Sequence, residues 1–117
     1  MAFIQADFQD VRDVQLVKRA KIDGATDGNN TLVAAVTGKK IRVLAVFFTM
    51  TGTAVTIRFE DGAGGTALTG QMGPTAGQTI VLPFNPVGWF ETSDATLLNM
   101  ELSGAQSVDG ALVYIEA

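Results

Sequence analysis

The stretch from residue 40 to residue 61, KIRVLAVFFTMTGTAVTIRFED, constrains the fold more than any other part of the chain. Its first half contains an almost continuous apolar run, residues 43–48, which is typical of a strand covered on both faces. Its second half, residues 55–60, alternates apolar and polar side chains, as a strand with one face in water does. Gly52 lies between the halves and supplies the backbone freedom of a tight connection. The stretch therefore predicts a central β-hairpin.

A helix is the rival interpretation of these residues. Valine, isoleucine, threonine and phenylalanine lose side-chain freedom against a helical turn, and a glycine interrupts the run, so strands are favoured. The alternation in the second strand predicts that Arg58 and Glu60 point outward. They lie where a basic part of the chain gives way to an acidic part. We therefore regard them as candidate partner-binding residues.

Charge is divided unevenly along the chain. Residues 1–58 carry eight Lys/Arg and five Asp/Glu, whereas residues 59–117 carry seven Asp/Glu and no basic residue. This division is either chance in a small sample or a sign that basic and acidic edges meet between subunits. Charged residues make up only 17% of the chain, which leaves little charge to solvate a small domain. We expect copies of the chain or a partner to cover part of its surface.

The rest of the chain also predicts strands separated by loops rich in glycine, aspartate and asparagine. Further strands are expected at residues 14–22, 31–36, 78–82, 97–102 and 111–116. Lysines and an arginine on the first of these favour the edge of a sheet, and the last is apolar on both faces, which favours the inside of a sheet or a subunit boundary. Residues 104–110 are predicted to join the last two strands as a hairpin loop. The fold class predicted is an all-β antiparallel sandwich of about eight strands.

The chain is expected to contain one domain, residues 14–117, preceded by an arm, residues 1–13. The arm, MAFIQADFQDVRD, has apolar residues at helical spacing among acidic and amide side chains. It either packs on its own subunit or reaches a partner. Its candidate contact residues are Phe3, Ile4, Phe8 and Val11.

Residues 83–91, PFNPVGWFE, form the most distinctive local stretch. Two prolines remove backbone donors, so this segment is expected at a strand edge or corner. Trp89 and Phe90 would then lie near the rim, either as an interface anchor, as a platform for a sugar, or as corner residues that close the core. A sugar site also needs several polar groups. The polar residues near Trp89 in sequence are Asn85, Glu91 and Thr92.

Enzymatic chemistry has little support in this composition. The chain has no cysteine and no histidine, which excludes thiolate zinc sites, thiol redox chemistry and imidazole bases. The acidic loop at residues 23–30 does not fit a calcium-binding EF-hand, because Ala34 stands where the bidentate glutamate would be. The glycine-rich loop at residues 61–65 matches no phosphate-binding pattern. We expect no catalytic residues, no metal and no cofactor.

Other partners are also excluded. No apolar stretch approaches the roughly 20 residues of a membrane span, and the amino terminus lacks the pattern of a signal peptide. We therefore expect no membrane partner and a chain made without export. The acidic balance, a net charge of −4, makes nucleic acid a poor partner.

Four segments together resemble a family of small bacteriophage and prophage virion proteins that have a jelly-roll-like β-sandwich. The segments are VTGKKIRVLAVFFTMTG, FEDGAGGTALTGQM, VLPFNPVGWFET and LNMELSGAQSVDGALVYIE. The resemblance covers about residues 36–116 and carries no catalytic residue. It implies a head decoration, or cement, protein that is assembled in the host bacterial cytoplasm. Such a protein would sit on the capsid surface as a homo-oligomer, often a trimer, and clamp neighbouring major capsid proteins.

Two other roles remain open at this point. One is a receptor- or carbohydrate-binding module of a tail fibre, which would use the rim around Trp89. The other is a structural tail or neck protein. The sequence does not separate a head protein from a tail protein.

Overall fold

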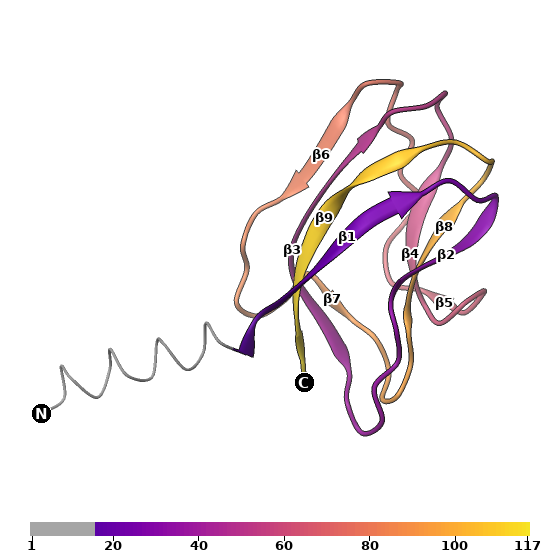
Figure 1. The fold of residues 1–117 in the computed structure, drawn as a ribbon. Coiled ribbons are helices and arrows are strands. Elements are labelled where there is room, and N and C mark those ends of the chain that lie inside the picture. Colours follow the sequence, from indigo (N-terminus) through magenta and orange to yellow (C-terminus); the bar gives the residue numbers. More distant parts are fainter. Residues whose placement is uncertain (1–15) are drawn as a thin grey trace, which may run out of the picture.

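The computed structural model describes residues 16–117, which form two antiparallel β-sheets packed against each other (Figure 1). The strands are β1 (Lys18–Gly24), β2 (Gly28–Val33), β3 (Ile41–Met50), β4 (Ile57–Asp61), β5 (Thr66–Ala67), β6 (Thr79–Leu82), β7 (Phe90–Glu91), β8 (Leu98–Leu102) and β9 (Val108–Glu116). Sheet A has the order β1-β9-β3-β6, with β7 also paired to β3, and sheet B has the order β2-β8-β4-β5. The predicted all-β sandwich is confirmed.

The strand order is that of a jelly roll. β1 pairs with β9, β2 with β8, β3 with β6, and β4 with β5, all antiparallel. The chain thus resembles one long hairpin that is wrapped around a core, which is the double Greek-key arrangement of this fold. The short β7 is an addition to the eight principal strands.

Both predicted hairpins are wrong. β3 lies in sheet A and β4 in sheet B, and β8 and β9 are divided between the sheets in the same way. Residues 51–56 and 103–107 are therefore loops that connect one sheet to the other, and the two loops are hydrogen-bonded to each other. The amides of Thr51 and Gly52 each donate to the carbonyl of Ser107 at 3.1 Å. The strands of each predicted hairpin therefore do not pair with each other. They form their backbone hydrogen bonds with other strands of their own sheets.

The predicted placement of the first and last strands is confirmed. β1, with its basic residues, lies at an edge of sheet A, and β9 lies inside that sheet between β1 and β3. Gly110 shows how closely β9 and β3 approach, since a Cβ built there would lie 2.0 Å from the carbonyl oxygen of Phe47. The glycine-rich loop is confirmed as a turn that joins β4 to β5. Gly62 and Gly64 occupy it with φ of 83° and 68°, a region that favours glycine.

An aromatic cluster fixes the two sheets to each other. Phe48 of sheet A meets Phe59 of sheet B edge to face, with ring centroids 5.8 Å apart. Phe90 also stacks on Phe59, with ring centroids 4.9 Å apart. Phe48 and Phe59 are fully buried. Burial of a side chain of this size stabilises a fold by about 1.5–3 kcal/mol. The core accordingly lies between the two sheets, and the outer faces of the sheets are not part of it.

Candidate functional site

The predicted arm lies outside the described residues. Its candidate contact residues, Phe3, Ile4, Phe8 and Val11, therefore stay predictions. The residues that the structure does describe divide between three places: the outer face of sheet A, the corner that follows β6, and the outer face of sheet B.

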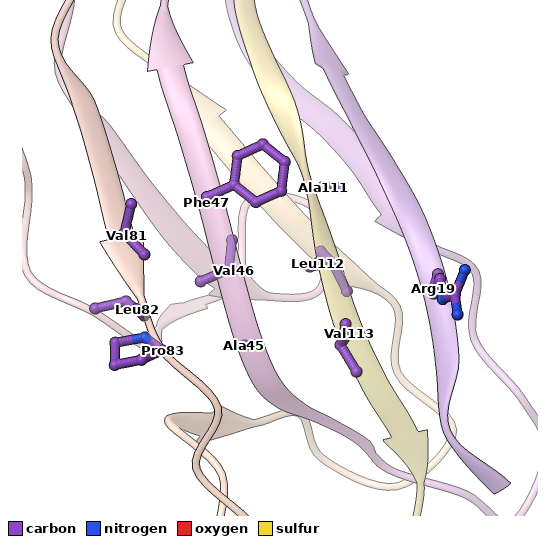
Figure 2. Close-up of a pocket in the computed structure, with 10 residues that line it drawn as sticks. All are labelled: Arg19, Ala45, Val46, Phe47, Val81, Leu82, Pro83, Ala111, Leu112 and Val113. Carbon is purple, nitrogen blue, oxygen red and sulfur yellow. The ribbon is translucent and has the colours of Figure 1, made fainter. Parts of the chain in front are cut away.

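The outer face of sheet A carries exposed apolar side chains. In the strand register, Phe47 of β3 lies opposite Val81 of β6 on one side and Ala111 of β9 on the other. Figure 2 shows these residues across three neighbouring strands. Phe47 is 48% exposed and Val81 is 62% exposed. The expectation that the strand containing Phe47 is covered on both faces is therefore not met within residues 16–117.

Beside Phe47 the face forms a shallow apolar depression of about 330 Å³, which we call the central hollow. Ala45, Pro83 and Val113 also line it. Arg19 of β1 borders the hollow and is its one charged lining residue (Figure 2). Among residues 16–117, Arg19 forms no ion pair. The hollow therefore presents an apolar surface with a positive charge at one side.

The sequence interpretation missed this face, although a signal for it was present. The outward residues of β3, β6 and β9 in the middle of sheet A are alanine, phenylalanine and valine rather than charged residues. An apolar run alone does not say whether its second face meets its own chain or another one. A β-bulge at Leu44 further shifts the register between Val43 and Ala45.

The corner that follows β6 also carries exposed apolar side chains. Trp89 is 42% exposed, Phe84 is 63% exposed and Val87 is 80% exposed. The indole Nε1 of Trp89 donates to the carbonyl of Pro83 at 2.7 Å, which closes the corner on itself. The segment is thus an ordered rim beside the central hollow, because Pro83 lines that hollow.

The polar groups expected beside Trp89 are all held by the protein. The Oδ1 atom of Asn85 accepts a bond from the amide of Val87. Glu91 is paired with Arg42 at 3.0 Å, and the Oγ1 atom of buried Thr92 accepts from the amide of Ile41. These groups are committed to the fold, so the corner offers an apolar contact surface more readily than a sugar site.

Phe90 has a structural place rather than an exposed one. Its side chain is half-buried and packs against the core, where it stacks on Phe59. The pairing of β7 with β3 explains this, because Phe90 lies opposite the inward-facing Val43. The expectation that Phe90 is presented at the rim together with Trp89 is therefore wrong.

The outer face of sheet B carries a polar network instead of apolar side chains. The Nη2 atom of Arg58 binds Oε2 of Glu60 at 2.7 Å and Oε2 of Glu101 at 3.0 Å. The Nδ2 atom of Asn99 donates to Oε1 of Glu60 and to Oδ1 of Asn29, each at 2.9 Å. The expectation that Glu60 points into water is wrong, since its side chain is fully buried. Arg58 remains about one-third exposed.

The network shifts the pKa values of its two carboxyl groups in opposite directions. Burial alone raises the pKa of Glu60, but hydrogen bonds with Glu101, Asn99 and Arg58 outweigh burial and lower it. The hydrogen bond with Glu60 raises the pKa of Glu101. The guanidinium of Arg58 thus interacts with two neighbouring carboxyl groups, which also interact with each other. One buried polar atom of this part of the chain, Oδ1 of Asn99, lacks a hydrogen-bond partner.

Residues 16–117 contain no group of three or more acidic side chains placed to hold a metal ion. Glu60 is out of reach of any bound molecule, because its side chain is fully buried. From Leu16 onward, no helix has the length and apolar character needed to cross a membrane. The feature with the clearest capacity for binding is the outer face of sheet A with its aromatic rim.

Comparisons with known proteins add no family to this description. No protein-family model matches the chain. A search of curated proteins likewise found no significant relative.

Proposed function

We propose that the chain is a structural protein of a bacteriophage virion. In this proposal it decorates the outer surface of the head as a homo-oligomer and holds neighbouring major capsid proteins together. The observation that carries the proposal is the exposed apolar face of sheet A. Monomeric proteins rarely leave large contiguous apolar patches in water, and such patches usually mark contacts between proteins.

Three further features support this role. The jelly roll is a fold that viral capsid domains share, although a fold alone does not define a function. The polar groups around Trp89 are engaged internally, which favours protein contacts over sugar binding. The sequence has neither histidine nor cysteine, which excludes imidazole bases and thiol chemistry and so favours a structural role over an enzymatic one. Attachment through several subunits would let weak individual contacts hold the oligomer firmly on a lattice.

Binding to empty heads tests the proposal. Expanded heads that lack a decoration protein are mixed with the purified full chain and sedimented, and the bound chain is quantified against the major capsid protein. We expect saturable binding with a fixed ratio, and greater resistance of the heads to heat. A chain that stays in the supernatant at every concentration would contradict the proposal.

A glycan array tests the competing role in a tail fibre. Selective glycan binding by the full chain that is lost in Trp89→Ala would assign the corner to a receptor-binding module instead. The decoration proposal predicts no selective glycan. The full chain and the variant should therefore give the same background signal.

A further inference from the structure

A second depression lies toward the amino-terminal end of β1. This terminal hollow has a volume of about 460 Å³, and Leu16, Leu44, Phe84 and Ile115 supply apolar lining. The two hollows are neighbours on one face of β9, because Val113 of the first and Ile115 of the second are two residues apart in that strand. Pro83 of the first and Phe84 of the second are adjacent in sequence. We call the two together the sheet A groove.

We propose that residues 1–15 of a neighbouring copy of the chain fill the sheet A groove. This inference concerns how the subunits join one another. It rests on the homo-oligomer of the proposed function and goes beyond attachment to a capsid, and capsid binding and arm exchange can each fail without the other.

The chemistry of this segment fits the groove. Residues 1–15, MAFIQADFQDVRDVQ, combine large apolar side chains with three aspartates and one arginine, a net side-chain charge of −2. The groove is apolar, and its charged lining residues are Arg19, Lys18, Lys39 and Glu116, three basic and one acidic. Lys18 is paired with Glu116 at 2.9 Å, whereas Arg19 and Lys39 form no ion pair within residues 16–117. An apolar segment with acidic side chains therefore matches the groove in both hydrophobicity and charge.

The position at which the segment joins the domain favours a neighbouring copy over the same copy. Leu16 lines the terminal hollow and is 67% exposed, so the described chain begins at one end of the groove. To return over its own groove, the chain would have to reverse its direction somewhere before Leu16. Residues 14–17, VQLV, contain none of the residues that favour tight turns. Fifteen residues span up to about 50 Å when extended, which is enough to reach another subunit.

In this arrangement each subunit uses two different surfaces, its arm and its sheet A groove, so the contact between subunits is head-to-tail. Such contacts close into rings when the rotation between subunits allows it. The inference therefore accounts for a cyclic oligomer, such as a trimer, without a second interface. It also explains how the exposed Phe47 and Val81 would be covered.

Complementation between two variants of the full chain tests the inference. Phe47→Glu blocks the groove but keeps a normal arm, and Phe8→Glu blocks the arm but keeps a normal groove. Ala63→Glu is the matched control, because Ala63 is exposed in the turn between β4 and β5 of sheet B. Oligomeric state is measured by analytical ultracentrifugation, and circular dichroism checks that each variant is folded. Val81→Glu repeats the groove variant at an independent position.

We expect the wild type and Ala63→Glu to be oligomers, and each blocked variant to be monomeric alone. Mixing Phe47→Glu with Phe8→Glu should then give a one-to-one heterodimer, because one intact arm meets one intact groove. A monomeric wild type would overturn the inference. So would a Phe8→Glu protein that stays oligomeric while Phe47→Glu is monomeric, since that result means that two copies pack face to face. These measurements contain no capsid, so they are independent of the head-binding test.

Discussion

On the outer face of sheet A, Phe47 and Val81 remain 48% and 62% exposed, whereas on the outer face of sheet B the fully buried Glu60 is bound by Arg58 and Asn99. Both faces belong to sheets of the same sandwich and cover the same core. Sheet B holds its outward polar side chains within the chain through hydrogen bonds and ion pairs, although Oδ1 of Asn99 has no partner there. Sheet A leaves its outward apolar groups to be covered by something else. The difference is the reason that we propose sheet A as the face that meets partners, whereas the polar network of sheet B is held within the fold.

The largest effect is expected from breaking the network on sheet B. Glu60→Leu should lower the free energy of unfolding by about 2–3 kcal/mol, because it leaves donors of Arg58 and Asn99 without their acceptor. Urea unfolding followed by circular dichroism measures this loss. Thr31→Leu is the control, since Thr31 is exposed on the same face and outside the network. Equal stability of Glu60→Leu and the wild type would show that the network does not support the fold.

A smaller effect on stability is expected when an exposed apolar side chain of sheet A is replaced by a polar one. Phe47→Ser should change the free energy of unfolding of the monomer by no more than about 0.5 kcal/mol, because the side chain is already half exposed. Its effect should appear in self-association. The melting temperature of the wild type should rise with protein concentration, as it does when an oligomer dissociates on unfolding, and that of Phe47→Ser should not. If the melting temperatures of both proteins depend on concentration in the same way, the outer face of sheet A does not mediate self-association, and the contrast with sheet B fails.

The smallest effect is expected from Glu101→Gln, and its sign follows from the raised pKa of Glu101. A group whose pKa is raised in the folded state contributes stability below its ordinary value, here 4.5, and loses that contribution as the pH rises through the raised value. Glutamine resembles the protonated acid. The variant should therefore melt slightly above the wild type at pH 7.

The difference in melting temperature between Glu101→Gln and the wild type should shrink as the pH falls toward 4.5. Glu60 has the opposite dependence, because its lowered pKa makes its contribution present above 4.5 and lost as the pH falls through the lowered value. Both proteins keep Glu60, and the glutamine of the variant still offers it an amide donor in place of the hydrogen bond with Glu101, so a similar loss is expected in both. Melting curves at pH 7 and at pH 5 measure the difference, and a variant less stable than the wild type at pH 7 would contradict the sign.

The candidate site was predictable only in part. Trp89 was expected in a corner near the rim, because two prolines exclude that segment from the middle of a sheet, and it lies there 42% exposed. Glu60 and Phe90 were expected at the surface, but Glu60 is buried and Phe90 is half-buried. Their contacts come from distant parts of the chain, since Asn99 donates to Glu60 and Phe59 stacks on Phe90. The sheet A groove was not anticipated at all. It exists because β1, β3, β6 and β9 come together in one sheet.

By itself the sequence determined that the protein is an all-β sandwich with a basic edge strand and an apolar inner strand, because side-chain alternation and turn residues act over a few neighbours. Only the tertiary structure decided which strands pair, and it placed the two halves of residues 40–61 in different sheets. The physical reason is that a period of two separates the faces of a strand without saying which face meets the core. Long-range pairing made that choice, and it left Phe47 outside while it enclosed Glu60.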